Sequence, residues 1–138
     1  MALRVEEISW SRGESHLAAI RREVFIKEQA CPVHEEFDGL DDGSRHLLAW
    51  WDSQPVGCAR IRGSKIERMA VLMPFRGRGI AGALLEKSME LARESGEGPV
   101  HLHAQTHAMG LYARWGFTPV GEGFMEAGIP HFQMILPR

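Results

Sequence analysis

The chain has 138 residues and a formal net charge of -2, with 44% hydrophobic and 25% charged residues. This length suits a single domain with a core of its own, and the composition excludes a wholly disordered chain. The small net charge argues against a protein that binds nucleic acids non-specifically through a basic surface. No apolar run approaches the ~20 residues that a membrane span requires.

The N-terminal third predicts a strand, a helix and a loop. Residues 3–9 alternate weakly between apolar and polar side chains, as a strand does. Residues 15–29 carry apolar side chains at helical spacing, so we expect a helix that Ser15 caps and that ends before Pro32. The acid-rich stretch 34–45 is expected to form a loop.

The middle of the chain predicts three strands in quick succession. The apolar runs 46–51 and 56–62 flank a turn-type tetrapeptide, residues 52–55, which favours an antiparallel hairpin. A third strand is expected at 65–73, after a short turn that contains a glycine.

The last part of the chain changes character. Residues 80–95 have the apolar stripe of a helix, 100–104 form a short strand and 107–115 a second helix. Two apolar runs within 117–136 are expected to close the sheet. The order of elements implies one α/β (α+β) domain over residues 1–138, a mixed sheet flanked by helices.

Cysteine usage and the first residues favour a cytoplasmic protein. Cys31 and Cys58 form no CxxC pair and are too few for a disulfide framework. The first ten residues include Glu6 and Glu7 and lack the apolar segment of a secretory signal.

The most informative stretch joins a strand to a helix through residues 76–81, RGRGIA. Glycines let the backbone turn tightly and approach a ligand closely. The first amides of a helix lack intrahelical partners and favour an anion, and the two arginines add positive charge. The turn is therefore expected to bind a phosphate group, most naturally a pyrophosphate, rather than to be a plain loop with a basic rim.

Two common nucleotide-binding patterns do not fit this turn. Glycines at 77, 79 and 82 also satisfy the dinucleotide fingerprint, but the following strand region supplies no acid for a ribose hydroxyl. Too few residues follow for a doubly wound sheet. No Gly-Lys-Ser/Thr sequence follows the glycines, which excludes a Walker loop.

Two motifs resemble a known family. Arg76-x-x-Gly79-x-Ala81 resembles the (Gln/Arg)-x-x-Gly-x-(Gly/Ala) signature of the GNAT superfamily of acyl-CoA-dependent N-acetyltransferases, and Tyr112-x-x-x-Gly116-Phe117 resembles its Tyr-x-x-x-Gly-Phe helix end. The resemblance covers nearly the whole chain. Further segments similar to a branch of small, stand-alone bacterial members are residues 25–32, 36–38, 102–105 and 128–131.

The resemblance implies a mostly antiparallel mixed sheet in which two parallel strands, here 65–73 and 100–104, splay apart. Acetyl-CoA would lie in the opening as cosubstrate, with its pantetheine arm on the main chain of the first strand and its pyrophosphate on the turn. The residues that the resemblance assigns to coenzyme binding are Met69, Ala70, Val71, Arg76, Gly77, Arg78, Gly79, Ile80, Ala81 and Tyr112.

The implied reaction is direct transfer of an acetyl group to a primary amine of a small molecule or to an exposed amino group. The reaction needs a proton acceptor for the incoming ammonium and a proton donor for the leaving thiolate. Tyr112 is the one tyrosine of the chain and stands at the family's general-acid position. A phenol with a pKa of about 10 can donate without being ionised at neutral pH; the alternative is a tyrosine that only packs in the core.

The proton acceptor has two candidates. Glu67 lies on the strand before the turn, where the family often places a carboxylate, and alternation would put it on the same face as Lys65 and Met69. Its alternative role is that of a solvated strand residue or an ion-pair partner of Arg60 or Arg68. His131, in the segment 128–131, is the second candidate, as a base or anchor on the substrate side. Its alternative is a surface histidine at the start of a strand.

Other polar groups leave choices open. His101, His103 and His107 lie close in sequence, but no acid or cysteine completes a metal set and the family needs no metal, so none is expected. The acids Glu28, Glu35, Glu36 and Asp38 either attract a cationic amine or belong to an ordinary solvated loop.

The sequence therefore predicts an N-acetyltransferase with acetyl-CoA and a small amine as its partners, without nucleic acid or membrane. The alternative of a different class is a non-catalytic acyl-CoA-binding or sensing module. A homodimer is compatible with the resemblance, since dimers are common in this superfamily.

Overall fold

The computed structural model describes residues 2–137 and contains seven strands in one sheet. They are β1 (Leu3–Ile8), β2 (Arg45–Trp51), β3 (Gln54–Arg62), β4 (Lys65–Val71), β5 (His101–Gln105), β6 (Thr118–Glu126) and β7 (Ile129–Ile135). Their order in the sheet is β1-β2-β3-β4-β5-β7-β6. Every neighbouring pair is antiparallel except β4 and β5, which are parallel. The predicted mixed sheet with one parallel pair is confirmed.

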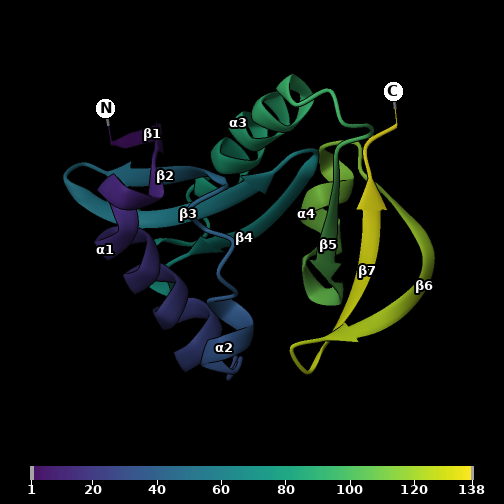
Figure 1. Cartoon of the computed structure of the whole chain (residues 1–138), viewed down its shortest axis with the longest axis horizontal. Coiled ribbons are helices and arrows are strands. Elements are labelled where there is room, and N and C mark those ends of the chain that lie inside the picture. The colour runs from purple at the N-terminus through teal and green to yellow at the C-terminus, as the bar shows by residue number, and fades with distance from the viewer. Residues whose placement is uncertain (1, 138) are drawn as a thin grey trace.

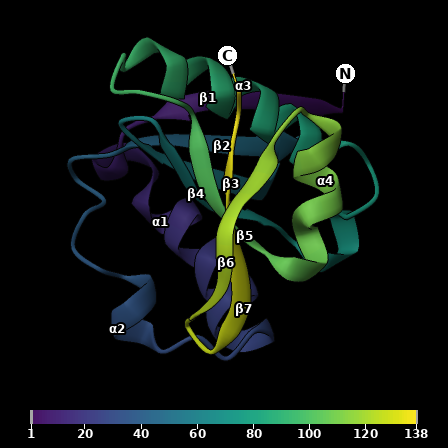
Figure 2. The same cartoon turned by 90° about the vertical axis from the view of Figure 1, so that its right-hand side faces the viewer.

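Helices cover both faces of this sheet. They are α1 (Trp10–Arg21), the π-helical segment η1 (Arg22–Glu28), α2 (Val33–Glu36), α3 (Ile80–Glu94) and α4 (Met109–Arg114), with short 3-10 turns η2 (Met73–Phe75) and η3 (Thr106–Ala108). Figure 1 shows β1–β4 to the left and β5, β7 and β6 to the right, and Figure 2 brings the latter three to the front.

The strands are apolar on both faces because each face carries its own core. Neighbouring residues Leu47 and Leu48 of β2 are both fully buried but belong to different clusters. Leu47 packs in the cluster of α3 and α4, which includes Leu84 and Leu85, whereas Leu48 packs in the cluster of α1, which includes Leu17. This two-sided burial explains why β2 is a continuous apolar run. None of the helices described over residues 2–137 is long and apolar enough to cross a membrane.

The first helix begins earlier than predicted. It starts at Trp10, and its cap is Ser9, whose hydroxyl accepts a hydrogen bond from the amide of Arg12 at 3.4 Å. The prediction of a Ser15 cap was wrong, because the helix runs through Gly13 despite the low helix propensity of glycine. Gly13 is instead the contact point with β1, since an added Cβ would lie 3.0 Å from the side chain of Ile8.

The stretch 34–45 is also not wholly a loop. Residues 33–36 form the short helix α2, and the rest of the stretch leads into β2 without regular structure. The predicted hairpin β2–β3 is present. The two apolar runs of 117–136 form β6 and β7, which pair with each other as a second hairpin.

The parallel pair β4 and β5 separates almost at once. Its register contains only Lys65 opposite His101 and Ile66 opposite Leu102. Directly after this contact, β4 has a bulge at Arg68, which has a left-handed φ of 54°. A bulge adds a residue and bends its strand, so β4 turns away from β5.

The bulge also changes which side chains share a face. Ile66 and Met69 pack against one core cluster although they are three residues apart, while Ala70 belongs to the other. Glu67 pairs with Arg60 of β3. Cys58 is two residues before Arg60, on the same face of β3, and it packs in the same cluster as Ala70. The prediction that Glu67 and Met69 share a face was therefore wrong, because the extra residue reverses the alternation between them.

Candidate active site

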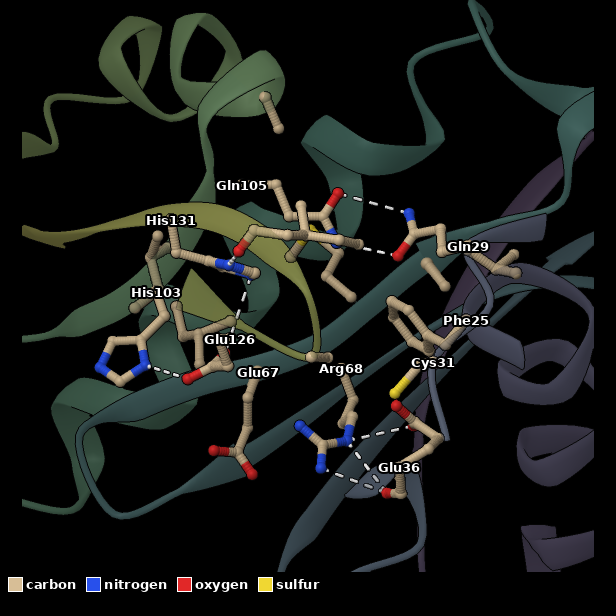
Figure 3. Close-up of a pocket in the computed structure, with 18 of the residues that line it drawn as sticks. Phe25, Gln29, Cys31, Glu36, Glu67, Arg68, His103, Gln105, Glu126 and His131 are labelled. Carbon is tan, nitrogen blue, oxygen red and sulfur yellow. Dashed lines mark hydrogen bonds and ion pairs between the residues drawn. The ribbon is translucent and has the colours of Figure 1, made fainter. Parts of the chain in front are cut away.

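A cavity of about 720 Å³ lies where β4 and β5 separate (Figure 3). Its walls come from β4, β5, α4, the η1–α2 segment and the turn between β6 and β7. Of the residues predicted from sequence, it brings together Glu67, Met69, Ala70, Val71, Arg76, Ala81, Tyr112 and His131.

A second hollow of about 260 Å³ adjoins the first at the start of α3. Val71, Arg76 and Ala81 line both, so the two form one continuous surface. The predicted turn residues that line only the second hollow are Gly77, Gly79 and Ile80.

The turn needs its glycines for conformation. Gly77 and Gly79 have φ values of 80° and 81°, in the left-handed region that L-residues with a Cβ rarely adopt. An added Cβ on either would meet no atom within 4 Å, so both face open space. The amide of Ala83 donates to the carbonyl of Gly79 at 3.1 Å, and the three amides before it precede this first helical bond. The turn thus presents main-chain donors to a hollow with room for an anion.

The two arginines of the turn are engaged elsewhere. Arg76 donates to both carboxylate oxygens of Glu28 at 2.7 and 2.8 Å and to the carbonyl of Val71 at 2.9 Å. The hydrogen bond between the two side chains raises the pKa of Arg76 and lowers the pKa of Glu28. Arg78 lines neither hollow, and its guanidinium lies 5.0 Å from the ring centre of Trp51. The turn therefore offers the hollow mainly main-chain N–H groups as hydrogen-bond donors.

Tyr112 lies on α4 and lines the larger cavity. Its ring packs edge-on against Phe117 with 6.2 Å between centroids. Burial raises the pKa of Tyr112 to about 12, so its hydroxyl keeps its proton at neutral pH. A neutral phenol can donate a hydrogen bond or a proton to a group in the cavity.

Glu67 lines the same cavity but is held by cations. Its carboxylate accepts hydrogen bonds from Arg60 at 2.7 Å and Arg62 at 2.9 Å, and Lys65 lies 3.4 Å away. Burial alone would raise the pKa of Glu67, but the hydrogen bond from Arg62 and the charges of Arg60 and Lys65 lower it to about 2. Of the alternatives for this residue, the structure shows the ion pair with Arg60.

The acids of the 34–45 stretch are part of a buried charge network. Arg21 contacts Glu36 at 2.6 Å and Asp41 at 2.7 Å, and Arg60 contacts Asp38 at 2.8 Å. Both arginines are 1% exposed, so the network fastens this segment to the sheet. Neither of the two roles predicted for these acids, an acidic rim that attracts an amine or an ordinary solvated loop, included such a buried network. The one signal in the sequence was Arg60, a charge within the apolar run of β3.

His131 lies on β7 and lines the larger cavity. It is 6% exposed, and its Nδ1 lies 2.6 Å from the carbonyl oxygen of Ile129. Its neighbours in the cavity include His103 and Glu126, which sequence reasoning did not assign to the site (Figure 3).

A pair of glutamine amides crosses the opening. Gln29, at the end of η1, and Gln105, at the end of β5, exchange hydrogen bonds of 3.3 and 2.9 Å (Figure 3). Sequence reasoning missed this pair because its members are 76 positions apart. Across residues 2–137, no three His, Cys, Asp or Glu side chains are grouped as metal ligands would be.

Comparison with known proteins agrees with this geometry. The family model of the acetyltransferase (GNAT) domain matches residues 10–137. YjcF of Bacillus subtilis, named an uncharacterized N-acetyltransferase, is 37% identical over 121 residues, which are 84% of this chain and 86% of that protein.

Solved structures show the same fold. The crystal structure of an acyl-CoA N-acyltransferase from Pseudomonas aeruginosa is 32% identical, with a TM-score of 0.85 over 99% of this chain and 100% of that chain. That of yncA from Salmonella typhimurium with its cofactor acetyl-CoA is 15% identical, with a TM-score of 0.73 over 99% of this chain and 94% of that chain. The sheet with its parting parallel strands, the glycine turn at the start of α3 and the family match together show that the chain belongs to the GNAT acetyltransferase family.

Proposed function

We propose that the protein is an acetyl-CoA-dependent N-acetyltransferase that transfers the acetyl group directly to a primary amine. The observation that carries this proposal is the continuity of the glycine turn, the opening between β4 and β5, and the cavity with Tyr112 and His131. Membership of the family and the acetyl-CoA in yncA support the choice of coenzyme. A cytoplasmic location, expected from cysteine usage, fits a reaction that consumes acetyl-CoA.

The coenzyme is proposed to lie along the opening. Its diphosphate faces the main-chain N–H groups of residues 77–81, where Gly77 and Gly79 leave room. The amide of Arg76 is not among these donors, because it already donates to the carbonyl of Met73. The pantetheine arm follows β4 from Met69 to Val71, where β4 has no pairing with β5. An unpaired strand edge is a natural partner for a ligand with amide groups.

Acetyl-CoA supplies a thioester carbonyl, and the protein has to manage two protons. Tyr112 is the proposed proton donor to the leaving thiolate, because its high pKa keeps the proton available. His131 is the preferred proton acceptor. Glu67 is disfavoured as a base, because a carboxylate with a pKa of about 2 has little affinity for a proton at neutral pH.

Calorimetry and a thiol assay test the proposal in order. CoA titrated into the folded protein should release binding heat, and acetyl-CoA with a panel of primary amines should release free thiol. Absence of heat with CoA overturns the whole proposal. Heat without thiol release for any amine, including amino groups of peptides, points instead to the non-catalytic acyl-CoA-binding module.

A further inference from the structure

His103, Glu126 and His131 lie together on the β5–β6–β7 side of the cavity (Figure 3). None of them lines the second hollow at the glycine turn. We propose that Glu126 and His131 form the acceptor's ammonium site, in which the carboxylate holds the cation and His131 Nε2 accepts its proton. This inference rests on the proposed function. It names the acceptor class as primary alkylamines that carry no carboxylate.

The hydrogen bond of His131 fixes its tautomer. A carbonyl oxygen only accepts hydrogen bonds, so Nδ1, 2.6 Å from the carbonyl oxygen of Ile129, carries the proton. Nε2 of the neutral ring is then the basic atom. The ring also stacks on Phe124 with 5.9 Å between centroids and a 20° interplanar angle, which restricts its rotation.

Glu126 is held from two directions. The residues after it, Ala127 and Gly128, have φ values of 51° and 77° and form the two-residue turn between β6 and β7. Its Oε1 accepts a hydrogen bond from Nδ1 of His103 at 2.9 Å. Oε2 therefore remains for a ligand.

The two free atoms are spaced for a shared cation. Glu126 Oε2 lies 3.8 Å from His131 Nε2, which is longer than a hydrogen bond. An ammonium nitrogen at about 2.8 Å from each atom fits beside such a pair. His131 is buried and Glu126 is about half exposed, so the site opens outward along the carboxylate.

The charges that line the cavity select for a cation. Each lining arginine or lysine is already paired with a carboxylate: Arg62 and Lys65 with Glu67, Arg68 with Glu36 and Asp38, and Arg76 with Glu28. Among the lining acids described in residues 2–137, Glu35 and Glu126 have no lysine or arginine partner. A carboxylate on the acceptor would therefore find no free cation and would meet unneutralised acids.

The proton balance follows from these positions. The ammonium gives one proton to His131 Nε2, the freed lone pair forms the C–N bond, and the C–S bond breaks with its electrons on sulfur. Tyr112 protonates the sulfur and regains a proton from the acylated nitrogen, while His131 releases its proton to solvent. Acetyl-CoA and an ammonium thus give an N-acetyl amide, CoA thiol and one proton.

Three four-carbon amines test the acceptor class: n-butylamine, 1,4-diaminobutane and 4-aminobutyrate. With saturating acetyl-CoA, kcat/KM for 4-aminobutyrate should be at least tenfold below that for n-butylamine. The kcat/KM for 1,4-diaminobutane should equal or exceed that for n-butylamine.

Glu126→Gln should raise the KM for n-butylamine at least tenfold and leave the KM for acetyl-CoA within twofold. Glu126→Asp should restore part of the loss. Glu122→Gln, an exposed position on the same strand, is the matched control and should behave as the unmodified protein.

A binding measurement separates this inference from the proposed function. In the CoA complex, n-butylamine should shift the NMR ring signals of His131, assigned with His131→Gln, and Glu126→Gln should abolish the shift. If these signals respond but no thiol is released, the function fails and the ammonium site stands. If thiol is released and Glu126→Gln keeps the KM of the unmodified protein, the ammonium site is wrong. If neither the His131 signals nor thiol release responds to any of the three amines, the ammonium site is overturned, and the full amine panel with peptides decides the proposed function.

Discussion

At the scale of single residues, the hydroxyl of Tyr112 carries the proposed acid step. Tyr112→Phe removes that oxygen and keeps the ring that packs on Phe117. We expect kcat to fall at least about tenfold, since general acid catalysis contributes on the order of 10²–10⁴, with the KM for acetyl-CoA within about twofold. A thiol-release assay measures both. A loss of kcat below about threefold would mean that Tyr112 only packs.

Glu67 makes a separate prediction about pH and stability. Its pKa of about 2 in the folded protein lies below the ordinary 4.5, so its ion pairs contribute fully above pH 4.5 and weaken as the pH falls toward 2. Glu67→Gln should lower the free energy of unfolding at pH 7 by about 3 kcal/mol, the lower end of the cost of breaking a buried ion pair, because Arg60 keeps its contacts with Asp38 and Asp41. The deficit should shrink at pH 3.

Denaturant unfolding at both pH values checks this prediction, and thiol release by the same variant checks the chemistry. An equal deficit at pH 7 and pH 3 would contradict the assigned ion pairing. A folded Glu67→Gln protein that binds CoA but has lost turnover would return the base role from His131 to Glu67.

Sequence patterns located these residues and offered an ion pair as one alternative for Glu67, but they did not show which contacts form. Tyr112 and the turn glycines belong to local motifs, in which the spacing itself carries the chemistry. The partners of Arg60 and Arg21 are separated from them by 22 and 15 positions, and alternation along a strand predicts a face rather than a neighbour. The ionisation of Glu67 depends on those contacts, so it could not be predicted from the sequence.

At the scale of elements, the start of α3 depends on the left-handed Gly79. Gly79→Val should weaken CoA binding at least about tenfold, because a β-branched residue is strained at a φ of 81° and its side chain would enter the hollow. Gly96→Val is a matched control: Gly96 follows the other end of α3, has a φ of 66° and also faces open space.

Both variants should lose stability by a similar amount, about 1–2 kcal/mol, and only Gly79→Val should lose affinity. Calorimetry with CoA and denaturant unfolding compare them. Equal CoA affinities of the two variants would remove the turn from the binding site.

The boundaries of helices and strands were predictable where burial of apolar side chains decided them. The strands β2 and β3 are nearly where the apolar runs placed them, because burial on both faces leaves little choice. The start of α1 was missed because a buried glycine contact outweighed the low helix propensity of Gly13. The bulge at Arg68 left no mark in the sequence, since arginine is not a residue that favours a left-handed φ.

At the scale of the whole molecule, the proposed coenzyme would contact both halves of the sheet. A ligand that binds only the folded state adds about 2.7 kcal/mol at a concentration of 100 Kd. For a domain of this size, CoA at that concentration should raise Tm by about 8–12 °C. Thermal unfolding with and without CoA measures the shift, and Gly79→Val at the same CoA concentration should show a smaller one. An unchanged Tm for the unmodified protein would argue against binding across the opening.

Because β4 and β5 part early, the edge of β4 between Met69 and Val71 has no strand paired with it on the β5 side. If the pantetheine arm takes that place, the substrate itself acts as the missing strand. The main-chain amides of β4 that face the gap, between Met69 and Val71, should then exchange with deuterium rapidly in the free protein and slowly once CoA is bound. The outer strand β1, paired with β2 along its whole length, should exchange at the same rate in both states.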